Sequence, residues 1–386
     1  MDDSRLPATS LTAAAPGPPG PVVESPARGR WAPVRFSEAS SRNGPAAARL
    51  PANVPPTLSV IVDTEEEFDW SLPFSHANAT VTASAGVHAF QRLLSRYGVV
   101  PTYLVTHPVA SDPRFAAVLR EYHRSGACAI GAHLHPWVTP PMTESISQPN
   151  SYACNLPIAL QELKVRALVR TLEDAFGLTP RLFKAGRYGV GDSTATVLER
   201  LGFEMDVSLN PGWDYSADGG PDFTRARQAP FWFGESRPLL EIPSSSGCTG
   251  VLGDRGLPLR RRCEKRPWSA IKLPGVLARV GLVDFVQLSP EGNTLDEMKR
   301  LARALLGRGT RTLTMTLHSP SLEAGHTTYV RTGADLQAFS DRMAGFLEFF
   351  LGDIGGIAET PEGVWARLVA VSAAGDETSG PNGGVA

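Results

Sequence analysis

Short apolar runs alternate with amphipathic segments along most of this chain. Runs of about four to eight apolar residues are typical of strands buried on both faces, whereas apolar residues repeating about every 3.6 positions predict helices. The apolar runs predict strands at residues 58–62, 99–105, 127–130, 181–185, 203–208, 239–243, 283–288 and 310–317. The periodic segments predict helices at residues 85–96, 113–125, 160–176, 192–201, 271–280, 295–306 and 334–351.

This alternation predicts an α/β fold with a parallel sheet and right-handed crossovers, most simply a (β/α) barrel over residues 57–352. Residues 1–56 are dense in Pro, Ala, Gly, Ser and Arg and have no apolar periodicity. We therefore expect them to form a disordered tail. Residues 353–386 are expected to form a C-terminal extension that is disordered after about residue 372.

Composition narrows the range of partners. The formal net charge of −2 gives no reason to expect a nucleic acid as partner. The sequence has no long apolar run of the kind that spans a membrane, and the N-terminus lacks the features of a secretory signal, so a cytoplasmic location is expected. The four cysteines are widely spaced and are interpreted as free thiols of a reducing compartment.

Polar residues follow the predicted strands at their carboxyl ends, where the sites of (β/α) barrels lie. These residues are Asp63 and Glu65, His133 and His135, Arg187 and Tyr188, Asp206, and His318. Their recurrence at strand ends indicates an enzyme more strongly than any one of them does. For each, a structural role is the alternative: a carboxylate can cap a loop, and a histidine can pack.

The segment AIGAHLHPW suggests a metal site. Side chains two residues apart on a strand point to the same face, so His133 and His135 project together. Two neutral imidazoles and one carboxylate make a three-ligand site for a divalent metal such as Zn²⁺. With a second carboxylate as base, an arginine to orient it and a histidine as acid, the set suits hydrolysis of an amide or ester.

The order of these motifs resembles the polysaccharide deacetylase family (NodB homology, carbohydrate esterase family 4), in a divergent, WalW-like branch. The motifs are SVIVDTEEEFDW, IGAHLHPW, KAGRYGV and TMTLHSPS, and the resemblance covers about residues 58–351. It implies a distorted (β/α) barrel of the glycoside hydrolase/deacetylase type and a metal-dependent deacetylase.

The resemblance also implies roles for individual residues. Asp63 is similar to the family's catalytic base, His133 and His135 to its metal-binding histidines, Arg187 to the residue that orients the base, and His318 to the general acid. The family's metal-binding aspartate falls on Thr64, a poor ligand, so Glu65 is expected to take its place. The family's His-x-x-x-His is shortened here to His-x-His.

Four further residues are candidates for substrate contact, and packing is the alternative for each: Trp137, Tyr188, Asp206 and Trp213. An aromatic face suits the C–H face of a sugar ring. The expected substrate is an N-acetylated or O-acetylated saccharide, such as a nucleotide- or lipid-linked sugar. Two alternatives stay open: a related C–N hydrolase that acts on a small non-sugar amide, and a catalytically degenerate barrel that binds glycan.

Overall fold

The computed structural model describes residues 32–45, 47–68, 72–264, 267 and 272–377, with residues 372–377 described by their backbone alone. The parts of the predicted tails at residues 1–31 and 378–386 lie outside these ranges.

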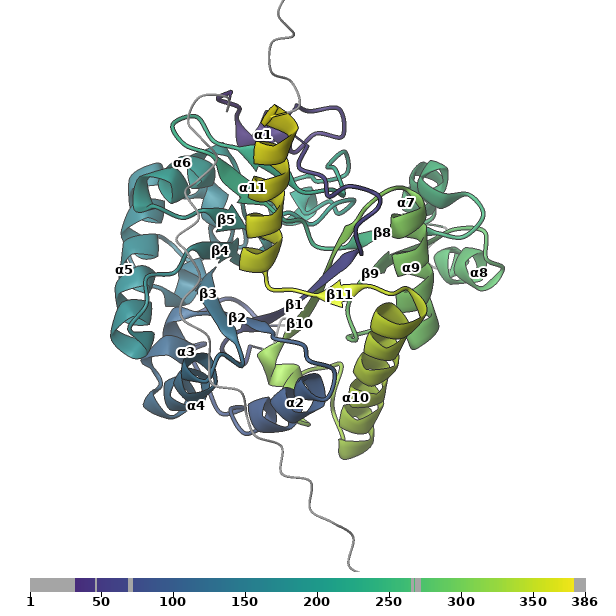
Figure 1. The fold of residues 1–386 in the computed structure, drawn as a ribbon. Coiled ribbons are helices and arrows are strands. Elements are labelled where there is room, and N and C mark those ends of the chain that lie inside the picture. The colour runs from purple at the N-terminus through teal and green to yellow at the C-terminus, as the bar shows by residue number, and fades with distance from the viewer. Residues whose placement is uncertain (1–31, 46, 69–71, 265–266, 268–271, 378–386) are drawn as a thin grey trace, which may run out of the picture.

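The central strand is β1 (Thr57–Thr64), in which every residue is buried. It pairs in parallel with β2 (Thr102–Val105) on one side and with β10 (Thr312–His318) on the other, so that Asp63 lies opposite His318 (Figure 1). The alternating side chains of β1 face two different environments. Val60 and Val62 pack in the large core under the helices, whereas Ile61 belongs to a second core inside the barrel.

Within the described residues, a nine-stranded sheet runs in the order β10-β1-β2-β3-β4-β5-β7-β6, with β11 also paired to β1. Its pairings are parallel apart from that of β6 with β7. The remaining bounds are β3 Ala129–Leu134, β4 Leu182–Ala185, β5 Met205–Asp206, β6 Phe231–Phe233, β7 Leu239–Glu241 and β11 Ile357–Ala358. The predicted α/β fold with a distorted barrel is confirmed.

The barrel is joined on its far side by single hydrogen bonds. Strands β8 (Ser246–Thr249) and β9 (Asp284–Gln287) form a separate antiparallel pair. Ser245 N–H donates to Thr314 O, Leu288 N–H to Ser245 O, and Thr316 N–H to Leu288 O. These bonds bring the loop after β9 beside the carboxyl end of β10, where a pocket forms.

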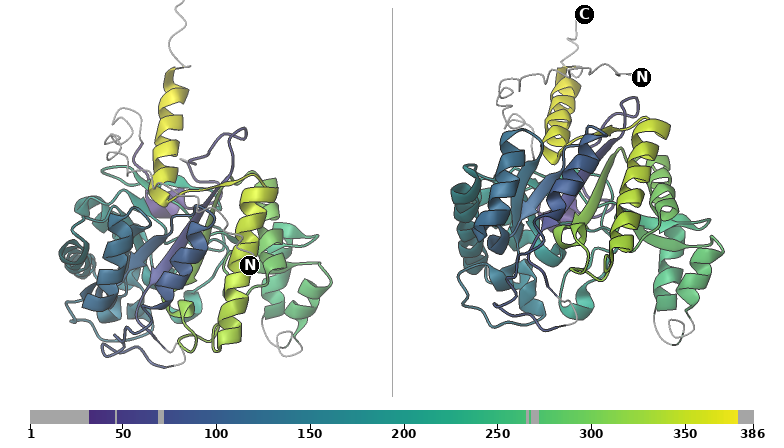
Figure 2. Two further views of the ribbon diagram at one scale, coloured as in Figure 1. Left: turned by 60° about the horizontal axis from the view of Figure 1, so that its bottom comes forward. Right: turned by 90° about the horizontal axis from the view of Figure 1, so that it is seen from below.

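Helices surround the sheet (Figures 1 and 2). Their bounds are α1 Phe36–Ala39, α2 Gly86–Ser95, α3 His107–Ser111, α4 Pro113–Arg124, α5 Ile158–Phe176, α6 Asp192–Leu201, α7 Leu257–Glu264, α8 Leu273–Arg279, α9 Leu295–Gly307, α10 Gly333–Glu348 and α11 Pro361–Glu377. Gly177 and Gly202 end α5 and α6 with positive φ angles of 71° and 83°, a conformation that glycine adopts without steric cost. No helix in the described ranges is both long and apolar enough to cross a bilayer.

The prediction that the chain is disordered up to residue 56 is wrong for the described residues 32–45 and 47–56. Val34, Phe36, Ala48 and Leu50 are buried, and residues 34, 41 and 47 form isolated bridges with the segment around β6. These apolar residues are spaced too irregularly within Pro-, Ala- and Gly-rich sequence to show periodicity. Their burial depends on tertiary contacts, which local pattern does not reveal.

The C-terminal extension also packs onto the barrel. Helix α11 continues to Glu377, past the expected limit of order at about residue 372. Val364, Trp365 and Leu368 lie in the same core as Ile61 and Leu104. The extension therefore covers the inner core at the end of the barrel away from His318.

Candidate metal centre and catalytic pocket

A cavity of about 470 Å³ lies at the carboxyl ends of the strands. It collects side chains from segments far apart in the sequence. Among the residues that line it are Asp63, Glu65, His133, His135, Lys184, Arg187, Tyr188, Trp213, Tyr215, Glu291 and His318. Most of the strand-end residues picked out in the sequence therefore share one pocket.

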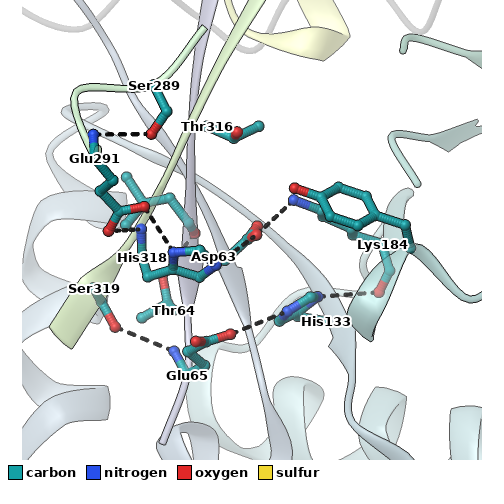
Figure 3. Close-up of polar contacts among 12 residues, drawn as sticks. Asp63, Thr64, Glu65, His133, Lys184, Ser289, Glu291, Thr316, His318 and Ser319 are labelled. Atoms are coloured by element: carbon teal, nitrogen blue, oxygen red, sulfur yellow. Dashed lines mark hydrogen bonds and ion pairs between the residues drawn. The ribbon is translucent and has the colours of Figure 1, made fainter. Parts of the chain in front are cut away.

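Glu65, His133 and His135 form a compact donor cluster in this pocket. Glu65 Oε2 lies 3.5 Å from His133 Nε2 and 3.4 Å from His135 Nε2. All three residues are buried, and their ligand atoms lie within 4.8 Å of one another. Thr64 is turned away, because its hydroxyl donates to Val62 O at 2.9 Å. Figure 3 shows Glu65 facing His133.

The hydrogen bonds behind the two imidazoles fix their orientation. His133 Nδ1 lies 3.2 Å from Lys184 O, and His135 Nδ1 lies 2.6 Å from Glu66 Oε1. Since a carbonyl and a carboxylate oxygen are acceptors, both Nδ1 atoms carry the proton and both Nε2 lone pairs face Glu65. A histidine held in this way by a second residue is the usual arrangement in metal sites. The donor set of two nitrogens and one carboxylate fits a divalent cation such as Zn²⁺.

Asp63 is paired with a lysine. Lys184 Nζ donates to Asp63 Oδ2 at 2.5 Å, and both side chains are buried. Asp63 Oδ1 is buried and has no hydrogen-bond partner among the described residues. Burial opposes ionisation of Asp63, but the charges of Lys184, His133 and His318 outweigh it and hold the pKa of Asp63 below its usual value. One carboxylate oxygen is thus held by the protein and the other is left to accept a proton.

The prediction that Arg187 orients the base Asp63 is wrong. Arg187 Nη1 donates to Ser151 Oγ at 2.6 Å, and Nη2 pairs with Asp218 at 2.8 Å. The reason is local backbone geometry. Lys184 lies in β4 in register with His133 and points into the barrel, whereas Arg187 follows the strand in a turn with a positive φ of 54°. Arg187 lines the same cavity but braces its outer loops.

His318 is held by Glu291, which the sequence analysis did not identify. Glu291 Oε2 lies 2.8 Å from His318 Nδ1, and His318 Nε2 lies 3.9 Å from Asp63 Oδ2 (Figure 3). Burial lowers the pKa of His318, but Glu291 and the nearby carboxylates Glu65 and Asp63 raise it well above the usual value. The signal for Glu291 was present, since it follows a predicted strand at 283–288.

The ligand residues have pKa shifts with identifiable causes. Burial opposes ionisation of Glu65, yet His318, His133 and His135 hold its pKa below the usual value. Burial and the neighbouring His135 lower the pKa of His133. Burial also opposes protonation of His135, but Glu66 overcomes it and raises the pKa of His135.

Aromatic side chains form one wall of the cavity. Tyr215 stacks between Tyr188 and Trp213, with interplanar angles of 18° and 9°. All three line the cavity. Tyr188 and Trp213 are therefore placed where substrate contact was expected.

Trp137 and Asp206 do not line the cavity, so the prediction that they contact substrate is wrong. Trp137 is buried and stacks on the ring of His135 at a centroid distance of 4.3 Å. Asp206 is the register partner of Phe183 and shares its face of the sheet, which is directed toward the helices. There Ser208 Oγ donates to Asp206 Oδ1 at 2.5 Å.

No family model matches this sequence, and no curated protein matches it. Solved structures of similar shape exist at low identity. A polysaccharide deacetylase from Mycobacterium smegmatis, described as putative, is 15% identical over 88% of this chain and 98% of its own, with a TM-score of 0.47. The peptidoglycan deacetylase PdaC from Bacillus subtilis is 12% identical over 85% and 98%, with a TM-score of 0.39.

BA3943, a carbohydrate esterase family 4 pseudoenzyme from Bacillus anthracis, is 8% identical over 81% of this chain and 66% of its own, with a TM-score of 0.40. The chain is thus similar in structure, at low identity, to these two deacetylases and to this family 4 pseudoenzyme. Its placement in a WalW-like branch stays a prediction.

Proposed function

We propose that this protein is a metal-dependent hydrolase that removes an acetyl group from an N-acetylated or O-acetylated sugar. The observation that carries the proposal is the convergence of three groups on one cavity: the Glu65–His133–His135 cluster, the Lys184–Asp63 pair and the Glu291–His318 pair. Each group supplies a different part of a hydrolytic reaction, and their residues come from the ends of β1, β3, β4 and β10 and from the loop after β9.

Glu65, His133 and His135 would hold a divalent cation, which when bound would supply Lewis acidity to polarise the carbonyl of the acetyl group. The protein supplies the proton transfers. Asp63 is the base, because its ionised form is favoured and its Oδ1 is not engaged by another described residue. Oδ1 accepts the proton of the attacking water while Lys184 holds Oδ2 in place.

His318 is the acid that protonates the departing nitrogen or oxygen. Its pKa is raised, so the imidazolium persists near neutral pH. Glu291 holds Nδ1, which leaves Nε2 to donate the proton into the cavity. A base and an acid whose pKa values are pushed apart by their surroundings divide the two transfers between them.

The aromatic wall supports a saccharide as substrate. Trp213 and Tyr188 offer flat apolar faces that suit the C–H face of a sugar ring. The sugar can be free or carried on a nucleotide or lipid, which extends outside the cavity in this proposal.

The test is acetate release from N-acetylated chito-oligosaccharides and from O-acetylated xylo-oligosaccharides, measured together with metal content. His133→Ala and His135→Ala should lose bound metal and acetate release together. His88→Ala is the matched control, since His88 lies on α2 and bonds Tyr122, and it should retain both. Activity that survives both cluster variants would overturn the metal mechanism. Metal binding without acetate release from any sugar would overturn the proposed activity.

A further inference from the structure

A second cavity of about 300 Å³ lies at the other end of β10 from the catalytic pocket. It is lined from three parts of the chain, at residues 42–44, 47 and 49, at residues 226–229 and at residues 308–310, with Asp254 beside them. Residue 310 precedes the first residue of β10, whereas His318 is the last residue of this seven-residue strand. Since a strand rises about 3.3 Å per residue, the two sites are roughly 20 Å apart.

Arginines dominate the lining of this cavity. Arg42, Arg49, Arg227 and Arg308 line it, and Asp254 is the one carboxylate among the described residues that does so. Asp254 is already paired with Arg308 at 3.0 Å. In the described part of the chain, neither Arg42 nor Arg49 forms an ion pair. The cavity therefore carries an excess of positive charge.

Arg227 shows that part of this positive charge is buried in the protein and does not lie only on a solvated surface. Its exposed fraction is 7%. Nε donates to Ser41 O at 3.0 Å and Nη2 to Gly44 O, both neutral acceptors. Nη1 is buried without a hydrogen-bond partner in the described residues. Burial and then the charge of Arg49 lower the pKa of Arg227. A buried charge is costly unless it is paired, and no described residue supplies a counter-ion for this guanidinium.

We propose that this cavity binds a phosphate or pyrophosphate group. Guanidinium groups present planar sets of donors that match the oxygens of phosphate. Arg227 supplies a buried donor to the lining of the site, and the exposed Arg42 and Arg49 supply further donors from the N-terminal segment. Gln228 also lines the cavity, and its buried Oε1, unpartnered in the described structure, can accept from a protonated phosphate oxygen.

The site is separate from the proposed hydrolase centre, and its existence does not depend on that activity. The anion can come from free phosphate, from a nucleotide or from a phospholipid headgroup. These sources share the same phosphoryl chemistry, so the experiment must distinguish them.

The test is isothermal titration of the full chain with inorganic phosphate, pyrophosphate, uridine diphosphate and a short-chain phosphatidic acid, with the tightest binder identifying the source. Arg49→Gln and Arg42→Gln should each weaken binding about tenfold, the expected loss for one charge-assisted contact. Arg124→Gln, which removes an exposed arginine from α4, is the matched control and should bind as the wild type does. Because Arg227 also braces two backbone carbonyls, Arg227→Met serves only as a supplementary variant.

The variant His133→Ala distinguishes anion binding at the catalytic pocket from anion binding at the arginine-lined cavity. The proposal expects phosphate binding to persist in His133→Ala and to weaken in Arg49→Gln. It is overturned if none of the four ligands binds at millimolar concentration, if Arg49→Gln and Arg42→Gln both bind as the wild type does, or if binding is lost in His133→Ala but kept in Arg49→Gln.

Discussion

Two pairs of buried acids lie in this barrel, and they behave in opposite ways. Asp63 lies at the end of β1 and Glu65 directly follows the strand, and both have pKa values below the usual value. Asp206 and Glu241 are register partners on β5 and β7, and both have raised pKa values, that of Asp206 at about 6. All four side chains are buried, with exposed fractions of 6% or less.

The difference comes from the charges around each pair. Lys184, His133 and His318 surround Asp63, and their attraction exceeds the cost of burial. Asp206 and Glu241 face each other, with Ser208 and the Leu209 N–H as hydrogen-bond donors. Burial raises the pKa of both acids in this pair, and the neighbouring Asp206 raises that of Glu241 further, so only the first pair is prepared to act as an ionised base and ligand.

The largest expected effect is that of Asp63→Asn. The amide keeps the shape of the carboxylate but cannot take a proton, so kcat should fall by about 10²–10⁴-fold, the usual contribution of a general base. Acetate release is the measurement, and bound metal should stay at the wild-type level because Glu65, His133 and His135 are unchanged. Turnover close to wild type would show that Asp63 is not the base.

Lys184→Met removes the cation that contributes most to lowering the pKa of Asp63, an influence that the Asp206–Glu241 pair lacks to the same degree. Asp63 loses its partner at 2.5 Å, so its pKa should rise and the acid limb of the pH–rate profile should move to higher pH. The rate should fall by about 10²-fold, as for a displaced catalytic group. Lys184→Arg, which keeps the charge, should restore much of this loss. An unshifted acid limb in Lys184→Met would assign the lysine a purely structural role.

Glu291→Gln tests the acid on the opposite side of the cavity. The variant removes the largest influence that raises the pKa of His318, so the alkaline limb of the profile should move to lower pH. At the optimum pH the loss should be about tenfold, smaller than the loss of the acid itself. The pH dependence of kcat/KM measures this, and an unchanged alkaline limb would contradict the assignment of His318.

Asp206→Asn should leave activity unchanged and alter stability instead. The folded protein retains a proton on Asp206 between its ordinary pKa of 3.8 and its folded pKa of about 6. The stability it contributes is therefore present below the lower value and lost as pH rises through the higher one. The asparagine removes this loss, so the free energy of unfolding at pH 8 should rise relative to pH 4 by roughly 2 kcal/mol. Denaturant unfolding at both pH values is the measurement, and a fall in acetate release would contradict the separation of the two pairs.

Much of the fold could be predicted because strands buried on both faces and amphipathic helices leave local patterns. The spacing of His133 and His135 was also sufficient to predict that the two imidazoles lie together, because side chains two residues apart on a strand point to the same face. Glu65 could be proposed because Thr64 is a poor ligand, and the structure places Glu65 with both histidines.

The predictions for Arg187, Trp137 and Asp206 failed because contacts between distant segments determine where these side chains lie. Asp63 follows one predicted strand and Asp206 lies in another, and only the pairing of β5 with β4 shows that Asp206 faces the helices. Arg187 matched a motif, but its turn directs it away from Asp63. Trp137 stacks on the ring of His135, whereas Trp213 lines the cavity. This difference depends on tertiary packing, which the local sequence does not reveal.

The most direct test of the account is the metal content of wild-type protein beside Glu65→Gln and Asp63→Asn, by elemental analysis after purification without chelators. The account predicts about one divalent metal ion per chain in the wild type and in Asp63→Asn, and a large loss in Glu65→Gln, because a three-ligand site loses its carboxylate. Full metal retention in Glu65→Gln, or a wild-type protein that takes up no divalent metal, would contradict the central claim.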